Sequence, residues 1–245
     1  HSLVPPGDPV VISGYEHNAV TRPLHGIPDV ELTVIDAPLF RPESMLAEFE
    51  QALDAGADAV ICTHVSNVFG YRLPVEGIAA LCRRRGVPFV LDASQSAGMM
   101  PVSMRELGAA FIAMPGHKGL LGPQGTGGIV LREDLAQELT PLLAGGTGSM
   151  SHTEFMPEFL PDRFEPGTMN LPGLAGLHAA LGFLMETGLD TIRAHELALT
   201  KRFLERIQPM QADGRLKIIG LPGMDNRAGV VSVQTTARDC ADTAA

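Results

Sequence analysis

Short, strongly apolar runs alternate with longer amphipathic stretches along most of the chain, and this alternation limits the folds that it can adopt. The short runs are rich in Val and Ile, and several are almost continuously apolar, as strands buried on both faces of a sheet are. Strands separated by helices predict an α/β fold with a mostly parallel sheet. The predicted strands are Pro9–Ser13, Glu31–Asp36, Ala59–Thr63, Pro88–Ala93, Phe111–Met114 and Gly128–Leu131.

The longer stretches predict helices, and the pattern changes after the last of them. Val75–Arg85 is the clearest case, because its arginines fall in the last turn, where they suit the helix dipole, and Gly86 follows as a stop signal. Beyond Pro209 two short strands are predicted, separated by a turn-rich segment. We therefore expect a large domain over residues 1–188 and the beginning of a small α+β domain over residues 189–245. The other predicted elements are helices Glu43–Ala55, Leu174–Thr187 and Asp190–Pro209, and strands Leu216–Ile219 and Gly229–Gln234.

Charge, hydropathy and cysteine content exclude several classes of protein. The 245 residues carry a net charge of −10 without a basic block, which argues against sequence-independent nucleic-acid binding. No stretch approaches the roughly 18 apolar residues of a membrane span. Cys62, Cys82 and Cys240 make no disulfide framework, so we expect a reducing, cytoplasmic compartment. Because the chain begins at His1 rather than Met and stops without a closing element, we expect a fragment of a longer protein.

Polar, chemically able residues follow four of the predicted strands. They occur in Gly14–Asn18, His64–Asn67, Asp92–Ser96 and Pro115–Gly119. Ligands of open α/β sheets bind beyond the carboxyl ends of the strands, so these four segments predict a site at one edge of the sheet.

Taken singly, the residues of these segments remain ambiguous. Asp92 could cap the next helix, or hold a cationic atom of a ligand. Lys118 could be a solvated loop residue, or a nucleophilic amine that forms a Schiff base with an aldehyde. His17 could be a core or capping histidine, or a flat ring stacked on an aromatic cofactor.

Two further patterns are weak. Gly119–Gly128 is rich in glycine, but it fits neither the nucleoside-triphosphate loop nor the dinucleotide fingerprint. Cys62 and His64 could both ligate a metal, yet no second pair of ligands accompanies them, so we predict no metal site.

The ordered series of motifs resembles the class V aminotransferase family of pyridoxal-phosphate enzymes, in particular its cysteine desulfurase and selenocysteine lyase branch. The resemblance implies fold type I, with a mostly parallel, seven-stranded-type sheet in the large domain, and pyridoxal 5′-phosphate as the cofactor. The matching segments are Glu16–Asn18, His64–Asn67 with Gly70 and Leu73–Pro74, Asp92–Gly98, Gly116–Gly119, Gly122–Gly127 and Arg163–Thr168.

The resemblance implies roles for three residues at the centre of the site. Lys118 is similar to the lysine that holds the cofactor as a Schiff base and then moves the α-proton of the substrate. Asp92 is similar to the partner of the pyridine nitrogen, which keeps that nitrogen protonated and the ring an electron sink. His17 is similar to the residue that stacks on the ring.

Four more residues are implied at the edges of the cofactor. Gln95 and Asn67 are similar to residues near its phenolic oxygen, and His117 to a ligand of its phosphate. Thr168 is similar to a residue that reaches the phosphate of the neighbouring subunit, so the resemblance also implies a homodimer.

The chain departs from the family pattern in several places. Pro115 stands where relatives often have a Ser or Thr whose hydroxyl binds phosphate, and Met169 stands where Pro often follows the Thr. The family's phosphate cup is expected before His1, and its cysteine loop and carboxylate-binding arginine after Ala245. Cys240 follows the last predicted strand at the expected start of a helix, so we do not take it for the nucleophile.

The resemblance implies a cysteine desulfurase, which converts L-cysteine to L-alanine and transfers the sulfur to an enzyme cysteine outside this chain. A sulfur-acceptor protein is an expected partner. Selenocysteine lysis or transamination on the same scaffold are the alternatives. An alternative of another class is a truncated, catalytically inactive fragment.

Overall fold

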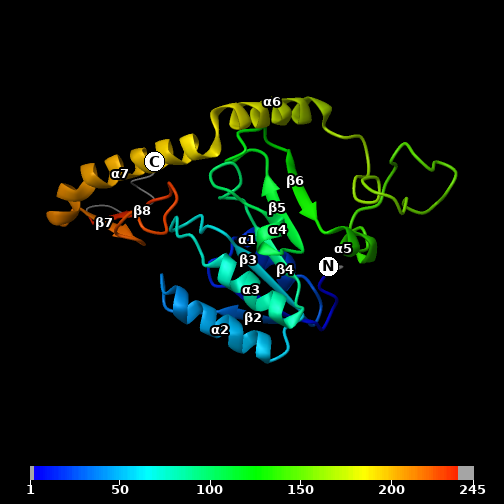
Figure 1. Cartoon of the computed structure of the whole chain (residues 1–245), viewed down its shortest axis with the longest axis horizontal. Helices are drawn as coiled ribbons and strands as arrows, with labels where there is room; N and C mark the ends of the chain where they lie inside the picture. Colours follow the sequence, from blue (N-terminus) through cyan, green and yellow to red (C-terminus); the bar gives the residue numbers. More distant parts are fainter. Residues whose placement is uncertain (1–2, 237–245) are drawn as a thin grey trace.

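A six-stranded sheet lies at the centre of the computed structural model, which describes residues 3–236 (Figure 1). The strand order is β2-β1-β3-β4-β5-β6, and every neighbouring pair is parallel except β5 and β6. The predicted mixed α/β fold is confirmed, and each predicted strand of the sheet is found within one residue of its expected ends. The bounds are β1 (Pro9–Ser13), β2 (Glu31–Ile35), β3 (Ala59–Thr63), β4 (Phe89–Asp92), β5 (Phe111–Pro115) and β6 (Gly127–Leu131).

The central strands are buried, and the strands at the two edges are not. β1 and β3 are almost entirely buried, as their continuous apolar runs predict. Val34 of β2 and Ile129 of β6 are about half exposed, at 49% and 52%. The run that contains Ile129 is just as apolar as the central strands, so only its place at the edge of the sheet decides its exposure.

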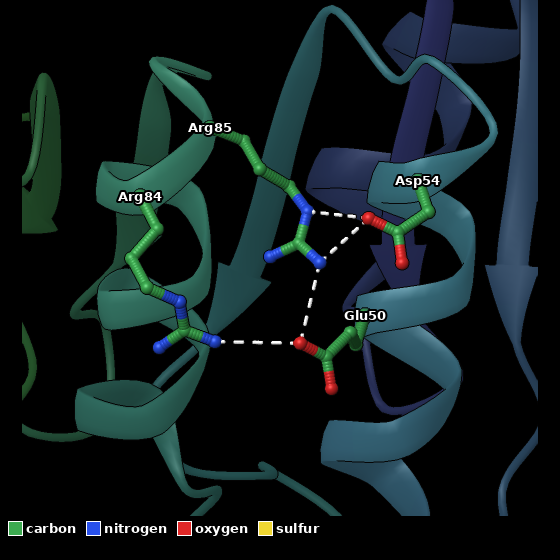
Figure 2. Close-up of polar contacts among 4 residues, drawn as sticks. All are labelled: Glu50, Asp54, Arg84 and Arg85. Carbon is green, nitrogen blue, oxygen red and sulfur yellow. Dashed lines mark hydrogen bonds and ion pairs between the residues drawn. The ribbon is translucent and has the colours of Figure 1, made fainter.

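Helices α2 (Pro42–Asp54) and α3 (Val75–Arg85) pack beside each other and against the sheet (Figure 1). Phe49 of α2 and Ile78 of α3 are fully buried in the main core together with residues of β1, β3 and β4. At the surface the two helices are joined by ion pairs, which Figure 2 shows. Arg84 contacts Glu50 at 3.4 Å, and Arg85 contacts Asp54 at 2.6 Å and Glu50 at 3.2 Å.

Three short helices are present that the sequence pattern did not predict: α1 (Asn18–His25), α4 (Met104–Leu107) and α5 (Glu133–Glu138). Each is eight residues or fewer, and α1 contains Pro23, so none offers the length of amphipathic pattern that identifies a helix. The two long helices are found as predicted, although α6 (Leu171–Thr187) begins three residues earlier and α7 (Leu189–Ala212) continues past Pro209. Within residues 3–236, no helix is long and apolar enough to cross a membrane.

The strands β7 (Leu216–Ile219) and β8 (Ser232–Thr235) form a separate antiparallel pair beside α7 (Figure 1). β8 was predicted from Gly229 but begins at Ser232. The segment before β8 is hydrogen-bonded to the loop after β3: Ala228 N donates to Gly70 O, and Arg72 N donates to Asn226 O, each at 2.8 Å. Cys240, with the helix expected to begin there, lies outside the described residues.

Candidate active site

The chain reverses its direction across the sheet between β1 and β3. From β1 it moves to β2 on one side, and then returns to β3 on the other side. Open α/β sheets bind ligands at such a reversal, because the loops that leave the two strands diverge there. A cavity of about 420 Å³ lies at this edge, within the usual range for small-molecule sites. It is lined by His17, Ala19, Thr63, Val65, Asn67, Asp92, Ser94, Gln95, Pro115, His117 and Lys118.

Six of the seven residues predicted for the site line this one cavity, although they come from four different strand ends. They are His17, Asn67, Asp92, Gln95, His117 and Lys118. Thr168 is exposed in the segment before α6 and does not line the cavity. Its expected role concerns a second subunit and stays a prediction.

His17 is the N-cap of α1. Its Nδ1 accepts a hydrogen bond from Ala19 N at 3.0 Å. This bond fixes the plane of the imidazole and leaves the proton of the neutral ring on Nε2. The capping role and a role at the cavity, which the sequence presented as alternatives, are therefore compatible.

Asp92 ends β4 and places a carboxylate on the cavity wall. Its Oδ1 accepts a hydrogen bond from Ser94 N at 2.8 Å, which orients the carboxyl group within the turn that follows the strand. Among the described residues, Asp92 is the only acidic side chain that lines the cavity. It can therefore stabilise a positive charge on a bound molecule.

Lys118 reaches the cavity from a loop whose backbone, at Gly119, packs closely against Gly98. Gly98 has φ of +83°, and a Cβ on it would lie 2.0 Å from Gly119 O, so no other residue fits there without movement of the backbone. Leu121 N closes the turn by donating to Lys118 O at 2.8 Å. In the described part of the chain, the Lys118 side chain has no hydrogen-bond or ion-pair partner, which leaves its amine available to a ligand.

Pro115 and Ser94 lie at another part of the cavity wall. Pro115, the last residue of β5, offers neither a hydroxyl nor an N–H to a ligand. Ser94 lines the same cavity with a hydroxyl group. Both residues also border a larger, mainly apolar cavity of about 680 Å³ between β6 and the segment around Phe164, which lacks the lysine, histidines and amides of the first one.

Cys62 and His64 make separate contacts rather than a shared site. Cys62 Sγ donates to Thr63 O at 3.3 Å, and His64 Nε2 accepts from Arg72 Nε at 3.3 Å. Burial, followed by the positive charge of Arg72, lowers the pKa of His64 to about 4, so the ring is neutral near neutral pH. Across residues 3–236, no group of three His, Cys, Asp or Glu side chains is placed to hold a metal ion.

Glu16 lies in the site region, although no role was predicted for it. Its Oε1 accepts from Thr63 N at 2.7 Å and from Ser13 Oγ at 2.5 Å. Burial, the largest effect, raises the pKa of Glu16 to about 8, and the nearby charge of Asp92 acts in the same direction. The available signal was an acidic residue three positions after the end of a buried strand, where a carboxylate needs a partner. The roles of Thr63 and Ser94 in lining the cavity were not predicted either.

Comparisons with known proteins agree on one family. The model of the aminotransferase class-V family matches residues 1–245. A probable cysteine desulfurase of Pyrococcus abyssi is 33% identical over 232 residues, which are 92% of this chain and 56% of that protein. A probable cysteine desulfurase of Methanothermobacter thermautotrophicus is 34% identical over 202 residues, which are 80% of this chain and 50% of that protein.

The fold is similar to that of a solved relative. The apo structure of the cysteine desulfurase from Thermococcus onnurineus NA1 superposes with a TM-score of 0.86 and 30% identity, over 99% of this chain and 62% of that one. The chain therefore spans about half the length of the two curated relatives and under two thirds of the solved one.

Proposed function

The chain belongs to the aminotransferase class-V family, and on that premise we propose that the whole protein is a pyridoxal-phosphate-dependent cysteine desulfurase. The observation that carries the proposal is the single cavity in which Asp92, His17 and Lys118 meet. The three residues supply a carboxylate, a flat ring fixed by its hydrogen bond at the start of α1, and an amine that has no partner within residues 3–236. These are the groups that an aldehyde cofactor with a pyridine ring requires.

The remaining wall of the cavity fits the cofactor with one exception. Asn67 and Gln95 offer amide groups to its phenolic oxygen, and His117 offers a ring nitrogen to its phosphate. Pro115 provides no hydroxyl to that phosphate, but the Ser94 hydroxyl on the same cavity could serve instead. The donors that line this cavity therefore fit the cofactor, and the family's phosphate cup, expected before His1, would complete the phosphate site.

The chemistry divides between the cofactor and three side chains. When bound, pyridoxal phosphate supplies a ring that withdraws electrons from the α-carbon of an amino acid. Asp92 would hold a positive charge on the pyridine nitrogen, and His17 would restrict the ring from one face. Lys118 would hold the cofactor covalently, and its free amine would accept the proton of the substrate's α-carbon.

The sulfur-transfer half of the reaction needs a thiolate, and the described cysteines are unsuited to supply one. Cys62 and Cys82 are buried, and burial raises the pKa of both thiols, that of Cys82 to about 12. Such thiols are inert rather than nucleophilic. Cys240 lies outside the described residues, and its place just after the last predicted strand does not match the family's later cysteine loop. We therefore propose that the sulfur-accepting cysteine lies outside this chain, with L-alanine and a persulfide as the products and a sulfur-acceptor protein as the next partner.

We further propose a homodimer of two-domain subunits in the cytoplasm. The exposed segment between α5 and α6 carries large apolar side chains that a second subunit could cover, among them Leu142, Leu143 and Phe155. Thr168 belongs to the same segment and would reach the phosphate of the neighbouring subunit. Residues 1–188 would form the cofactor-binding domain and residues 189–245 the start of the small domain. Free buried thiols suit a reducing compartment.

The test uses the whole protein mixed with pyridoxal phosphate. We expect an absorbance band of a lysine-bound cofactor, and borohydride reduction followed by peptide mass spectrometry should place the pyridoxyl group on Lys118. Lys118→Ala should abolish the band and lower cysteine turnover by about a thousandfold or more. Lys201→Ala, at an exposed position on α7, is the matched control and should retain both.

Failure to modify Lys118 would contradict the assignment of the cofactor. The substrate is tested separately, with a thiol reductant present to release the transferred sulfur or selenium, by measuring alanine and sulfide formed from cysteine against alanine and selenide formed from selenocysteine. Turnover of selenocysteine alone would identify the protein as a lyase of that substrate instead.

A further inference from the structure

Glu16 lies at the point where the two central strands separate. The register of β1 with β3 ends at Ile12 and Ile61, whereas the register of β1 with β2 continues to Ser13. Just beyond this point, the N–H of Thr63 donates to Glu16 Oε1 at 2.7 Å rather than to a backbone carbonyl of β1. The carboxyl group thus replaces the next backbone hydrogen bond between β1 and β3.

A short hydrogen-bond network fixes this carboxyl group. Ser13 Oγ donates to the same oxygen at 2.5 Å, and Tyr15 N donates to Ser13 Oγ at 3.2 Å. Thr63 lines the cavity, and His17 follows Glu16 directly in the chain. The network therefore sets the position of the His17 side of the cavity relative to the β3 side.

The second oxygen of Glu16 indicates the charge state of the group. Oε2 is buried and, among residues 3–236, has no hydrogen-bond partner. Leaving a carboxylate oxygen buried without a donor costs much more than leaving a neutral acid there. Asp92 is near enough to disfavour a second negative charge, and the thiol of Cys62, whose pKa is raised by burial and by Glu16, is neutral as well.

We propose that Glu16 is a positioning residue of this site, which holds the ends of β1 and β3 together as a neutral acid and so leaves Asp92 as the one negatively charged group, among the described residues, at the cavity. The effect of Glu16 on the cofactor rests on the proposed function, whereas the neutral state and the contacts of its carboxyl group do not. A second anion near Asp92 would alter the balance of charge that Asp92 supplies to a bound cofactor, whereas a neutral Glu16 leaves it unchanged.

Infrared difference spectroscopy tests the charge state without added cofactor. At about pH 7, the wild-type spectrum minus that of Glu16→Gln should contain the carbonyl band of one protonated carboxyl group. The matched control is Glu31→Gln, which lies at the exposed amino end of β2, whereas the cavity lies at the carboxyl ends of the strands. Its difference spectrum should contain carboxylate bands only. Carboxylate bands for Glu16 would overturn the proposal.

Cofactor titration tests the positioning role. Glu16→Gln keeps an oxygen for Thr63 N–H and should bind pyridoxal phosphate within about twofold of wild type, whereas Glu16→Ala should bind about tenfold more weakly. If Glu16→Ala does not fold, Ser13→Ala serves instead and should weaken binding about threefold, since it removes one of the two donors. Wild-type affinity in the variant that folds would overturn the proposal. A wild-type protein that binds no pyridoxal phosphate would contradict the proposed function, while the infrared result would still decide the state of Glu16.

Discussion

Two buried ionisable groups beside the site, the carboxyl group of Glu16 and the imidazole of His64, respond to burial in opposite ways. Burial favours the uncharged form of each, so it raises the pKa of the acid to about 8 and lowers that of the base to about 4. The contribution of Glu16 to stability is present below its ordinary pKa and is lost as the pH rises toward 8. The contribution of His64 is present above its ordinary pKa and is lost as the pH falls toward 4.

His64 should therefore make the fold sensitive to acid. From about pH 7 to about pH 5, we expect its linkage to lower the free energy of unfolding by on the order of 2 kcal/mol, because the unfolded chain takes up a proton that the buried ring does not. The measurement is chemical denaturation at both pH values for wild type and His64→Gln, whose amide can still accept from Arg72. An equal loss of stability in the two proteins would contradict the assignment of this effect to His64.

At the scale of elements, the pairing of α2 with α3 depends on its buried side. The arginines of α3 and the acids of α2 form the ion pairs of Figure 2, but most of these side chains are well exposed to solvent and salt. Beneath them Phe49 and Ile78 are fully buried in the main core. Burial of apolar surface, rather than charge, should therefore dominate this contact.

This ordering can be measured with two truncations on the facing helices. Phe49→Ala should lower the free energy of unfolding by about 3–5 kcal/mol, because it leaves a cavity in the core. Arg84→Ala should lower it by less than about 1 kcal/mol, and that loss should shrink as salt is added. The free energy of unfolding is measured with a non-ionic denaturant, at low and at high salt, because an ionic denaturant would itself screen the ion pairs. Comparable losses of unfolding free energy in the two variants would show that the ion pairs matter more than their exposure suggests.

For the molecule as a whole, the loop after β3 connects the cavity to the β7–β8 pair. Asn67 lines the cavity, and three residues later Gly70 O accepts from Ala228 N. Gly70 has φ of +64°, and a Cβ on it would lie 2.5 Å from Val230 O. Arg227 is only 3% exposed and stabilises the segment that contacts Gly70. Its guanidinium donates to three backbone carbonyl groups of that segment: Gly223 O at 2.8 Å, Val230 O at 3.0 Å, and Leu221 O.

Arg227→Lys should loosen this connection, because a lysine ammonium cannot span three carbonyl groups held by the fork of a guanidinium. We expect a loss of about 3 kcal/mol in unfolding free energy and faster hydrogen exchange at Ala228 N–H. Arg215→Lys is the control, since Arg215 pairs with Asp213 at the surface. Unchanged exchange at Ala228 in the Arg227 variant would show that the buried guanidinium does not hold the two parts together.

The order of strands and helices, the end of the sheet that carries the site and most of the residues that line the cavity could be predicted from the amino-acid sequence. This prediction was possible because short apolar runs identify the strands. Polar residues that follow such runs lie together at the carboxyl ends of the strands of a parallel sheet. Asp92 and Lys118 could be selected in this way without any knowledge of their contacts.

Which of these residues come into contact, and which hydrogen bonds orient them, depends on contacts between segments that are far apart in the sequence. The cap that orients His17 depends on α1, a helix too short and too interrupted by Pro23 to be recognised from its pattern. The exposure of β6 depends on its neighbours in the sheet. The role of Glu16 depends on Thr63, which is distant in the chain but adjacent where β1 and β3 part. Sequence patterns record what each segment prefers, whereas hydrogen bonds and burial between distant segments exist only once the chain has folded.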